Sequence, residues 1–158
     1  MAIEKWISGS GVGLTWTAAF GASDLNSMPS GSSILSSGGA INNGTPLDLF
    51  ADISISLGSF TPLAPNNISV FIYPLNQDGT TYGDGQLTAG TQAAKTPAAP
   101  YWVGNIILTL VAGVQVGTLG GIRLPPGPFL FVIQNNAGAT LASSGNVVKY
   151  WTYNLQVA

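Results

Sequence analysis

The chain has 158 residues, of which four are basic and six are acidic, and it contains neither histidine nor cysteine. Their absence excludes disulfides, thiol nucleophiles and Cys/His zinc sites, and it removes the commonest general base. Ordinary domains carry about 25% charged residues, whereas here the fraction is 6%. Because charge keeps soluble proteins apart, we expect a surface that carries a neutral polar coat or lies against copies of itself or a partner.

The distribution of charge and hydropathy also limits the classes of partner. Lys5, Lys95, Arg123 and Lys149 stand singly, so the clustered cations that bind nucleic acid are missing. No run of 18 apolar residues is present to span a membrane. Residues 1–5 lack the basic and apolar regions of an export signal. We expect no nucleic-acid partner, no membrane partner and no cofactor.

Glycine and proline are spread along the chain and divide it into short segments rich in β-branched and aromatic residues. This pattern is typical of many short strands joined by turns. Residues 1–15 are predicted to form an N-terminal arm, and residues 16–158 a single β-sandwich domain. Within that domain we expect a strand inside 11–20 and an irregular loop region over 21–44, where apolar anchors are few.

The clearest predicted strand covers residues 48–57. Its apolar positions are Leu49, Ala51, Ile53, Ile55 and Leu57, and its polar positions are Asp48, Asp52, Ser54 and Ser56. This alternation predicts one face on a core and the other in solvent. Phe50 interrupts the polar face and is a candidate contact with a neighbouring subunit or with the next strand. Residues 68–73 alternate too, and we expect them to pair antiparallel with 48–57.

The second half of the chain predicts five more strands. Residues 102–111 are apolar on both faces, which favours a central or covered strand, and residues 117–124 predict a short edge strand. The apolar run 129–134 suits the sandwich core, and strands are expected at 139–143 and 147–155. No segment has helical periodicity. The sequence therefore predicts an all-β, single-domain β-sandwich, jelly-roll-like, with about eight short antiparallel strands and long loops.

Residues able to do chemistry are few. Asp48 and Asp52 share a strand face, but four residues of strand separate their carboxylates by about 13 Å, too far for an acid–base pair; a solvated face is the simpler interpretation. Residues 78–85 resemble part of a calcium loop without its closing glutamate, and turn formation is the simpler interpretation. The glycines of 9–13 lack a P-loop ending. We expect no catalytic residue and no metal site.

The four tryptophans, Trp6, Trp16, Trp102 and Trp151, suit stacking on sugars or contact with proteins, although packing within the chain is the simpler interpretation. A segment around Trp6 and Ile7 precedes a Gly/Ser hinge and is a candidate contact arm; the alternative is that Trp6 folds back onto its own sandwich. The candidate interface residues are Ile3, Trp6, Ile7, Phe50 and Trp151.

Six segments, in chain order, carry a resemblance to a known family. They are residues 48–52, 78–82, 122–129, 132–138, 142–146 and 153–154. Together they resemble a group of small tailed-bacteriophage structural proteins of the capsid decoration, or cement, type. The resemblance covers residues 47–157, and its most distinctive parts are the Pro-Pro-Gly-x-Phe and Ser-Gly-Asn elements. Residues 1–45 match nothing in that group.

The resemblance implies a β-sandwich or jelly-roll subunit that binds the outer surface of the head and reinforces contacts between major capsid proteins, without catalysis. The expected partners are the major capsid protein and the chain itself, as a homotrimer. The expected location is the outer capsid surface of the virion, and the host cytoplasm during assembly. Two alternatives stay open: a head-fibre or tail-fibre module that binds a receptor or carbohydrate, and a tail or neck structural subunit.

Overall fold

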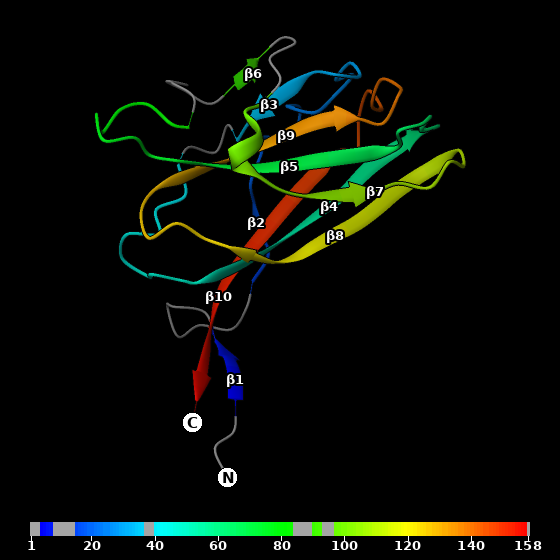
Figure 1. Ribbon diagram of the computed structural model, residues 1–158. Coiled ribbons are helices and arrows are strands. Elements are labelled where there is room, and N and C mark those ends of the chain that lie inside the picture. Colours follow the sequence, from blue (N-terminus) through cyan, green and yellow to red (C-terminus); the bar gives the residue numbers. More distant parts are fainter. Residues whose placement is uncertain (1–3, 8–14, 37–39, 84–89, 93–96, 158) are drawn as a thin grey trace.

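The computed structural model describes residues 4–7, 15–36, 40–83, 90–92 and 97–157, which form two stacked antiparallel sheets of five strands each (Figure 1). The strands are β1 Glu4–Ile7, β2 Thr17–Ala18, β3 Ser33–Leu35, β4 Phe50–Phe60, β5 Asn67–Pro74, β6 Gly90–Gln92, β7 Trp102–Ile107, β8 Gly113–Arg123, β9 Phe129–Asn136 and β10 Val147–Val157. A single 3₁₀ turn, η1 Ala99–Tyr101, precedes β7. Within the described residues, no helix has the length and hydropathy to cross a membrane.

The strand order is that of a jelly roll. One sheet runs β1-β10-β4-β8, with β2 also paired to β10, and the other runs β6-β3-β9-β5-β7. Without β1 and β6, the layer β2-β10-β4-β8 faces the layer β3-β9-β5-β7. Most successive strands therefore cross from one layer to the other, as two Greek keys require. The predicted β-sandwich is confirmed.

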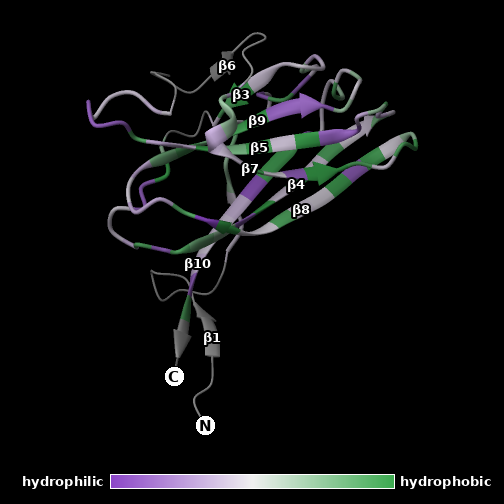
Figure 2. Ribbon diagram, viewed as in Figure 1, coloured by the Kyte–Doolittle hydropathy of each residue, from purple (hydrophilic) through white to green (hydrophobic). Residues whose placement is uncertain are grey.

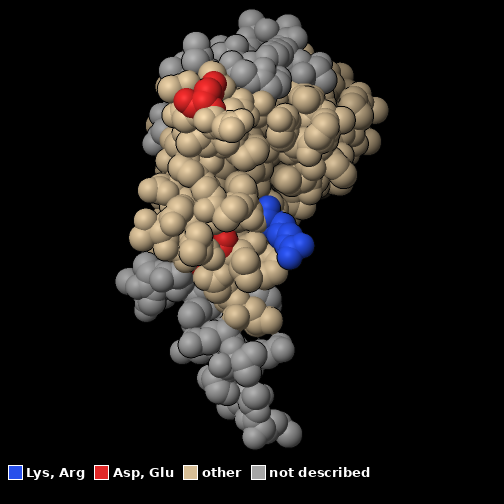
Figure 3. Space-filling view, turned by 60° about the vertical axis from the view of Figure 1, so that its left-hand side comes forward, with Lys and Arg blue, Asp and Glu red and all other residues tan. Residues whose placement is uncertain are grey.

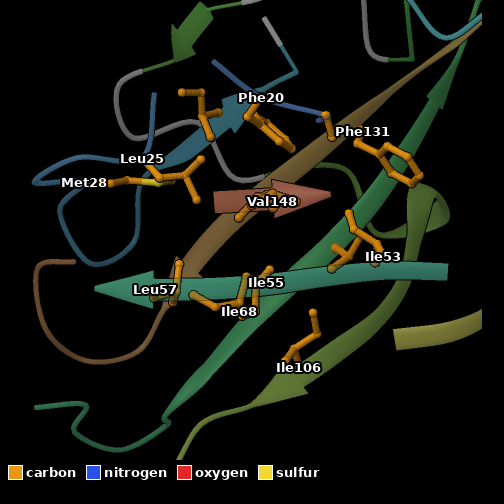
Figure 4. Packing of buried hydrophobic residues seen from close by; sticks show 14 of the residues in the cluster. Phe20, Leu25, Met28, Ile53, Ile55, Leu57, Ile68, Ile106, Phe131 and Val148 are labelled. Carbon is orange, nitrogen blue, oxygen red and sulfur yellow. The ribbon is translucent and has the colours of Figure 1, made fainter. Parts of the chain in front are cut away.

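The core lies between the two layers and uses alternate residues of most strands. In β4 the side chains of Ala51, Ile53, Ile55 and Leu57 are buried, as the alternation predicts. Residues from both layers meet them, as the close view of the cluster shows (Figure 4). Strand β9 is buried on both faces up to its last residue, because it is central in its sheet, with β3 on one side and β5 on the other.

The segment predicted to be an irregular loop contributes more to this core than expected. Leu25 and Met28 are buried (Figure 4), and so is Ile34. β3 pairs with β9 and β6. The expectation of few apolar anchors over 21–44 is therefore wrong. These residues follow no strand or helix period because a series of turns, rather than one regular element, brings them inward.

Three other expectations about strands are corrected. β4 and β5 do not pair, because residues 61–66 carry the chain from one layer to the other and β5 pairs with β7 and β9. Residues 139–143 form no strand. Leu141 there is buried, and its backbone N–H donates to the Met28 carbonyl, which closes the loop onto the core. The strand predicted to be central or covered at 102–111 is β7, an edge strand on which Ile107 is exposed.

A two-stranded ribbon extends beyond the sandwich. β4 pairs with residues 147–153 of β10, and β1 pairs with residues 154–157, placing Trp6 opposite Leu155. The ribbon and both of its strand ends lie at the foot of the molecule, away from the two layers (Figure 1). The N-terminal segment is thus held by its backbone to the last strand over Glu4–Ile7.

Candidate functional site

Two of the predicted interface residues lie on the outer face of the β10-β4-β8 layer. Trp151 stacks on Trp16 with ring centroids 4.4 Å apart, and Phe50 stacks on Tyr153 at 5.8 Å. Both are half-buried by the chain itself. Ile3 lies outside the described residues, and for Trp6 and Ile7 only the backbone pairing with β10 is described. A role in an interface stays a prediction for all five residues.

The carboxylate of Asp52 is engaged by the neighbouring strands. It accepts hydrogen bonds from Trp151 Nε1 at 2.7 Å, from Tyr153 Oη at 2.8 Å and from the Gly121 backbone N–H at 2.9 Å. Burial and the adjacent Asp52 carboxylate together raise the pKa of Tyr153 to about 12. A carboxylate with this many donors ties β4 to its neighbours on both sides.

Asp48 was expected on a solvated face, and this expectation is wrong, because its side chain is 3% exposed. It accepts from Asn154 Nδ2 at 2.9 Å and from Thr152 Oγ1, both on β10. Its own backbone N–H donates to Asn43 Oδ1 at 2.8 Å. Leu47 has φ +50, so the chain turns just before β4 and the alternation predicted from residue 48 begins only at Phe50.

The loop that resembles a calcium site is closed by its own hydrogen bonds. Asp78 accepts from the backbone N–H groups of Thr80 and Thr81 and from Thr81 Oγ1. These bonds, those from Thr81 first, lower the pKa of Asp78 to about 2. Asp84 lies outside the described residues. In the part of the chain that the structure describes, no three acidic side chains are grouped in a way that could hold a metal ion.

A hollow of about 290 Å³ lies beside the Trp16–Trp151 stack. Its lining comprises Trp16, Ser54, Ile55, Ser56, Val147 and Lys149, on the outer face of β4 and β10. A second hollow, of about 310 Å³, is lined by residues 17–19, residues 40–42 and, on β10, Tyr150 and Thr152. An indole beside hydroxyls is the kind of surface on which a sugar stacks.

The most exposed apolar side chains lie at the opposite edge of the sandwich, where β7 and β8 meet. Among the described large apolar side chains, the five most exposed all fall between residues 107 and 116, with exposed fractions from 59% to 69%. They are Ile107, Leu110, Val111, Val114 and Val116, at the end of β7, in the connecting turn and on β8; we call them the β7–β8 ridge. Figure 2 shows apolar residues recurring along these two strands.

The ridge has no charged residue near it in the sequence, since none occurs between Lys95 and Arg123. Figure 3 shows one face of the molecule, where a few charged atoms lie in a broad neutral surface. Edge strands of monomeric proteins are normally protected by charged side chains, prolines or short length. The ridge therefore lacks the charges that usually protect such an edge.

The inner side of the corner between β7 and β8 is fixed in the core by two glycines. A Cβ on Gly117 would lie 2.3 Å from Ile106 Cγ2, and a Cβ on Gly104 would lie 2.8 Å from Leu119 Cδ2. Each strand thus places a large side chain over a glycine of the other strand, and the two layers approach closely at this corner. The ridge is carried by a rigid part of the sandwich.

The turn that connects β7 to β8 is held by a buried side chain, Gln115. Its Oε1 accepts from the Thr109 backbone N–H and from Thr109 Oγ1, both at 2.9 Å, and its Nε2 donates to the Val111 carbonyl at 2.9 Å. These bonds fix the backbone that presents Leu110 and Val111. A surface ordered in advance loses less entropy when a partner binds.

Comparison of the chain with protein-family models, with curated proteins and with solved structures finds no match. Fold and surface together define the class of protein, a jelly-roll sandwich with a preformed, uncharged apolar edge. Sequence reasoning missed the five ridge residues. The signal that points to them is the long charge-free interval that ends at Arg123.

Proposed function

We propose that this chain is a structural subunit that acts by surface contact, as a phage capsid decoration protein on the outside of the head. The observation that carries the proposal is the β7–β8 ridge, in which the most exposed apolar side chains gather on one rigid, uncharged edge. Such a surface gains free energy when a protein covers it, because apolar area leaves water. The similarity of residues 47–157 to decoration proteins supplies the particular kind of assembly.

The described carboxylates are consistent with a role in holding strands rather than in catalysis. Asp48 and Asp52 are saturated by donors from β10 and β8, and Asp78 closes its own turn. A decoration protein needs no proton transfer; it needs several weak contact patches that a symmetric lattice repeats.

The β1–β10 ribbon is the second contact surface of the proposal. An isolated two-stranded ribbon is marginally stable in water, so this one gains when it packs against another protein. Trp6 and Ile7 lie on β1 opposite Leu155 and Asn154, next to the part of β10 that pairs with β4. We assign them to the capsid contact.

The proposal is tested by adding the purified chain to phage heads that lack it and measuring co-sedimentation. Immuno-electron microscopy of intact virions then shows whether the label lies on the head surface, as expected, or on the tail or neck, which would favour the other structural role. Absence of label from virions contradicts the proposal. Deletion of residues 1–10 should abolish head binding at an unchanged melting temperature; a large loss of stability would show that the segment serves the fold instead.

A carbohydrate-binding module is the second candidate, favoured by the hollow beside Trp16. It predicts saturable binding of a sugar on a glycan array. Trp16→Ala should abolish that binding, and Trp102→Ala, which changes a half-exposed tryptophan on β7, should leave it intact. Head binding that survives Trp16→Ala separates the two functions.

A further inference from the structure

We propose that the free edge of β8 pairs antiparallel with the β8 edge of a second copy, about a two-fold axis at Val116. The pairing joins two β10-β4-β8 layers into one continuous sheet. This inference rests on the proposed function, since it names the first partner of the β7–β8 ridge. It replaces the expected homotrimer by a dimer.

The outer side of β8 is a sheet edge that no described strand covers. Among the described strands β8 pairs only with β4, and β7 only with β5. In an antiparallel ladder every second residue turns its N–H and C=O away from the paired neighbour, so the free side of β8 is a row of donors and acceptors. β8 has 11 residues, about twice the usual strand length. It contains neither proline nor, before Arg123, any charge.

A bulge limits the part of β8 that can pair with a straight strand. The strand begins at Gly113. After Leu119 its register against β4 shifts, at Gly120 and Gly121, and Gly121 has φ +69. Such a bulge twists an edge away from a straight neighbour. A second register shift, between the Leu57–Gln115 and Phe60–Gly113 pairs, puts the extra residue on β4 rather than on β8. The stretch of β8 without an extra residue is therefore 113–119, and its middle residue is Val116.

Residues 113–119 of β8 are complementary to the same residues of a second copy. An antiparallel pair centred on Val116 places Val114 opposite Thr118 of the copy and Val116 opposite its counterpart, all β-branched and all on the exposed outer face. On the inner face it places Gln115 opposite Gly117. Leu119 falls opposite Gly113 of the copy, so each large side chain meets a glycine. β-branched cross-strand pairs stabilise a sheet, and no like charges meet.

These observations favour a copy of the chain over an unrelated partner. A two-fold axis needs a single surface that matches itself, whereas a cyclic trimer needs two different matching surfaces. The β8 stretch satisfies the two-fold requirement in both backbone direction and side-chain size. Leu110 and Val111 of the ridge then lie beside the joined edge, where the copy covers them.

The experiment compares the same valine-to-lysine substitution at two positions that lie in line across the sheet. Ser56 pairs with Val116 on one side and with Val147 on the other, and both valines are exposed. The full chain should sediment and scatter light as a dimer. Val116→Lys should raise the dimer dissociation constant by about 100-fold or more, because a lysine on an edge strand blocks pairing. Val147→Lys, two strands inside the sheet, should leave it within about threefold.

A cysteine cross-link tests the position of the axis. The chain has no cysteine, so Val116→Cys introduces a unique thiol. Directly opposite residues of an antiparallel pair have Cα atoms about 4.5 to 5.5 Å apart, within the range a disulfide spans. Oxidation should convert Val116→Cys to a covalent dimer, whereas Val147→Cys should stay monomeric on a denaturing gel.

Several outcomes overturn the pairing. They are a wild-type chain that is monomeric or trimeric at about 100 μM, equal effects of the two lysine variants at unchanged melting temperature, and failure of Val116→Cys to cross-link. Head binding by a monomer would overturn the pairing alone. A dimer that binds no heads would overturn the proposed function alone.

Discussion

The two flanks of β4 differ in how the chain satisfies them. On the β10 side, Asp48 and Asp52 accept hydrogen bonds from Thr152, Asn154, Trp151 and Tyr153, and two aromatic pairs cover the outer face. On the β8 side, apart from the Gly121 bond, the outer face carries a hydroxyl pair, in which Thr118 Oγ1 donates to Ser54 Oγ at 3.1 Å. Beyond it stand exposed valines.

This difference separates interactions that hold the fold from surfaces left for association. Polar groups on the β10 side are partly buried and therefore need partners within the chain. Apolar groups on the β8 side contribute nothing to the fold while they face water. The predictions that follow test this separation, from the largest expected change in the free energy of unfolding to the smallest.

Asp48→Ala should lower the free energy of unfolding by about 3 kcal/mol, because it leaves Thr152 and Asn154 with unsatisfied, partly buried groups. Urea denaturation monitored by circular dichroism measures the change. Asp48→Asn retains one acceptor and should recover part of the loss. If alanine costs less than asparagine, the β10 side does not depend on these hydrogen bonds.

Gly117→Ala should cost about 2 kcal/mol, because its Cβ would lie 2.3 Å from Ile106 Cγ2 and buried overpacking costs about this amount. Gly127→Ala is the matched control, since a Cβ there meets nothing within 4 Å. Equal melting temperatures for the two variants would show that the corner between β7 and β8 is looser than the contacts indicate.

Asp52→Asn should cost about 1 kcal/mol at neutral pH, since its three donors lose a charged acceptor and one of the two accepting oxygens becomes an NH2 group. The pKa of Tyr153, about 12, exceeds the value near 10 of an unfolded tyrosine. Stability that depends on the neutral phenol is thus complete below about pH 10 and is lost as the pH rises through about 12. Ultraviolet titration of tyrosinate should show a lower pKa for Tyr153 in Asp52→Asn; an unchanged pKa would remove Asp52 as a cause.

Val114→Thr should change the free energy of unfolding by less than about 0.5 kcal/mol, because the side chain is exposed and keeps its shape. The same substitution at Val70, which is fully buried, should cost about 2 kcal/mol, since it buries a hydroxyl. Thermal melts of both variants measure the contrast. A large loss at Val114 would mean that the exposed valines serve the fold after all.

Local pattern predicted the elements whose alternation is strict. Ile53, Ile55 and Leu57 fell on the core face, as expected, and β9 and β10 were placed within two residues of their observed ends. Asp48 was misplaced because its environment comes from Asn43 and from β10, about a hundred residues away in the chain. A period within one strand carries no information about such long-range partners.

The expectation for residues 102–111 failed for a different reason. An apolar strand predicts burial, but hydropathy does not say whether the same chain or another one does the covering. Ile107 is exposed within this chain. The pairing of 48–57 with 68–73 failed because a jelly roll separates neighbouring strands into different layers, and the residues of the 61–66 connection do not reveal that crossing.

The continuity of β10 has a mechanical consequence. The strand runs without interruption from its pairing with β4 into its pairing with β1. A pull on the ribbon along β10 therefore loads the β4–β10 ladder in shear, and hydrogen bonds perpendicular to the strands share that load instead of opening one after another. The same ribbon pulled sideways from β1 unzips from its end. The sheet therefore resists tension along the last strand more strongly than tension across it.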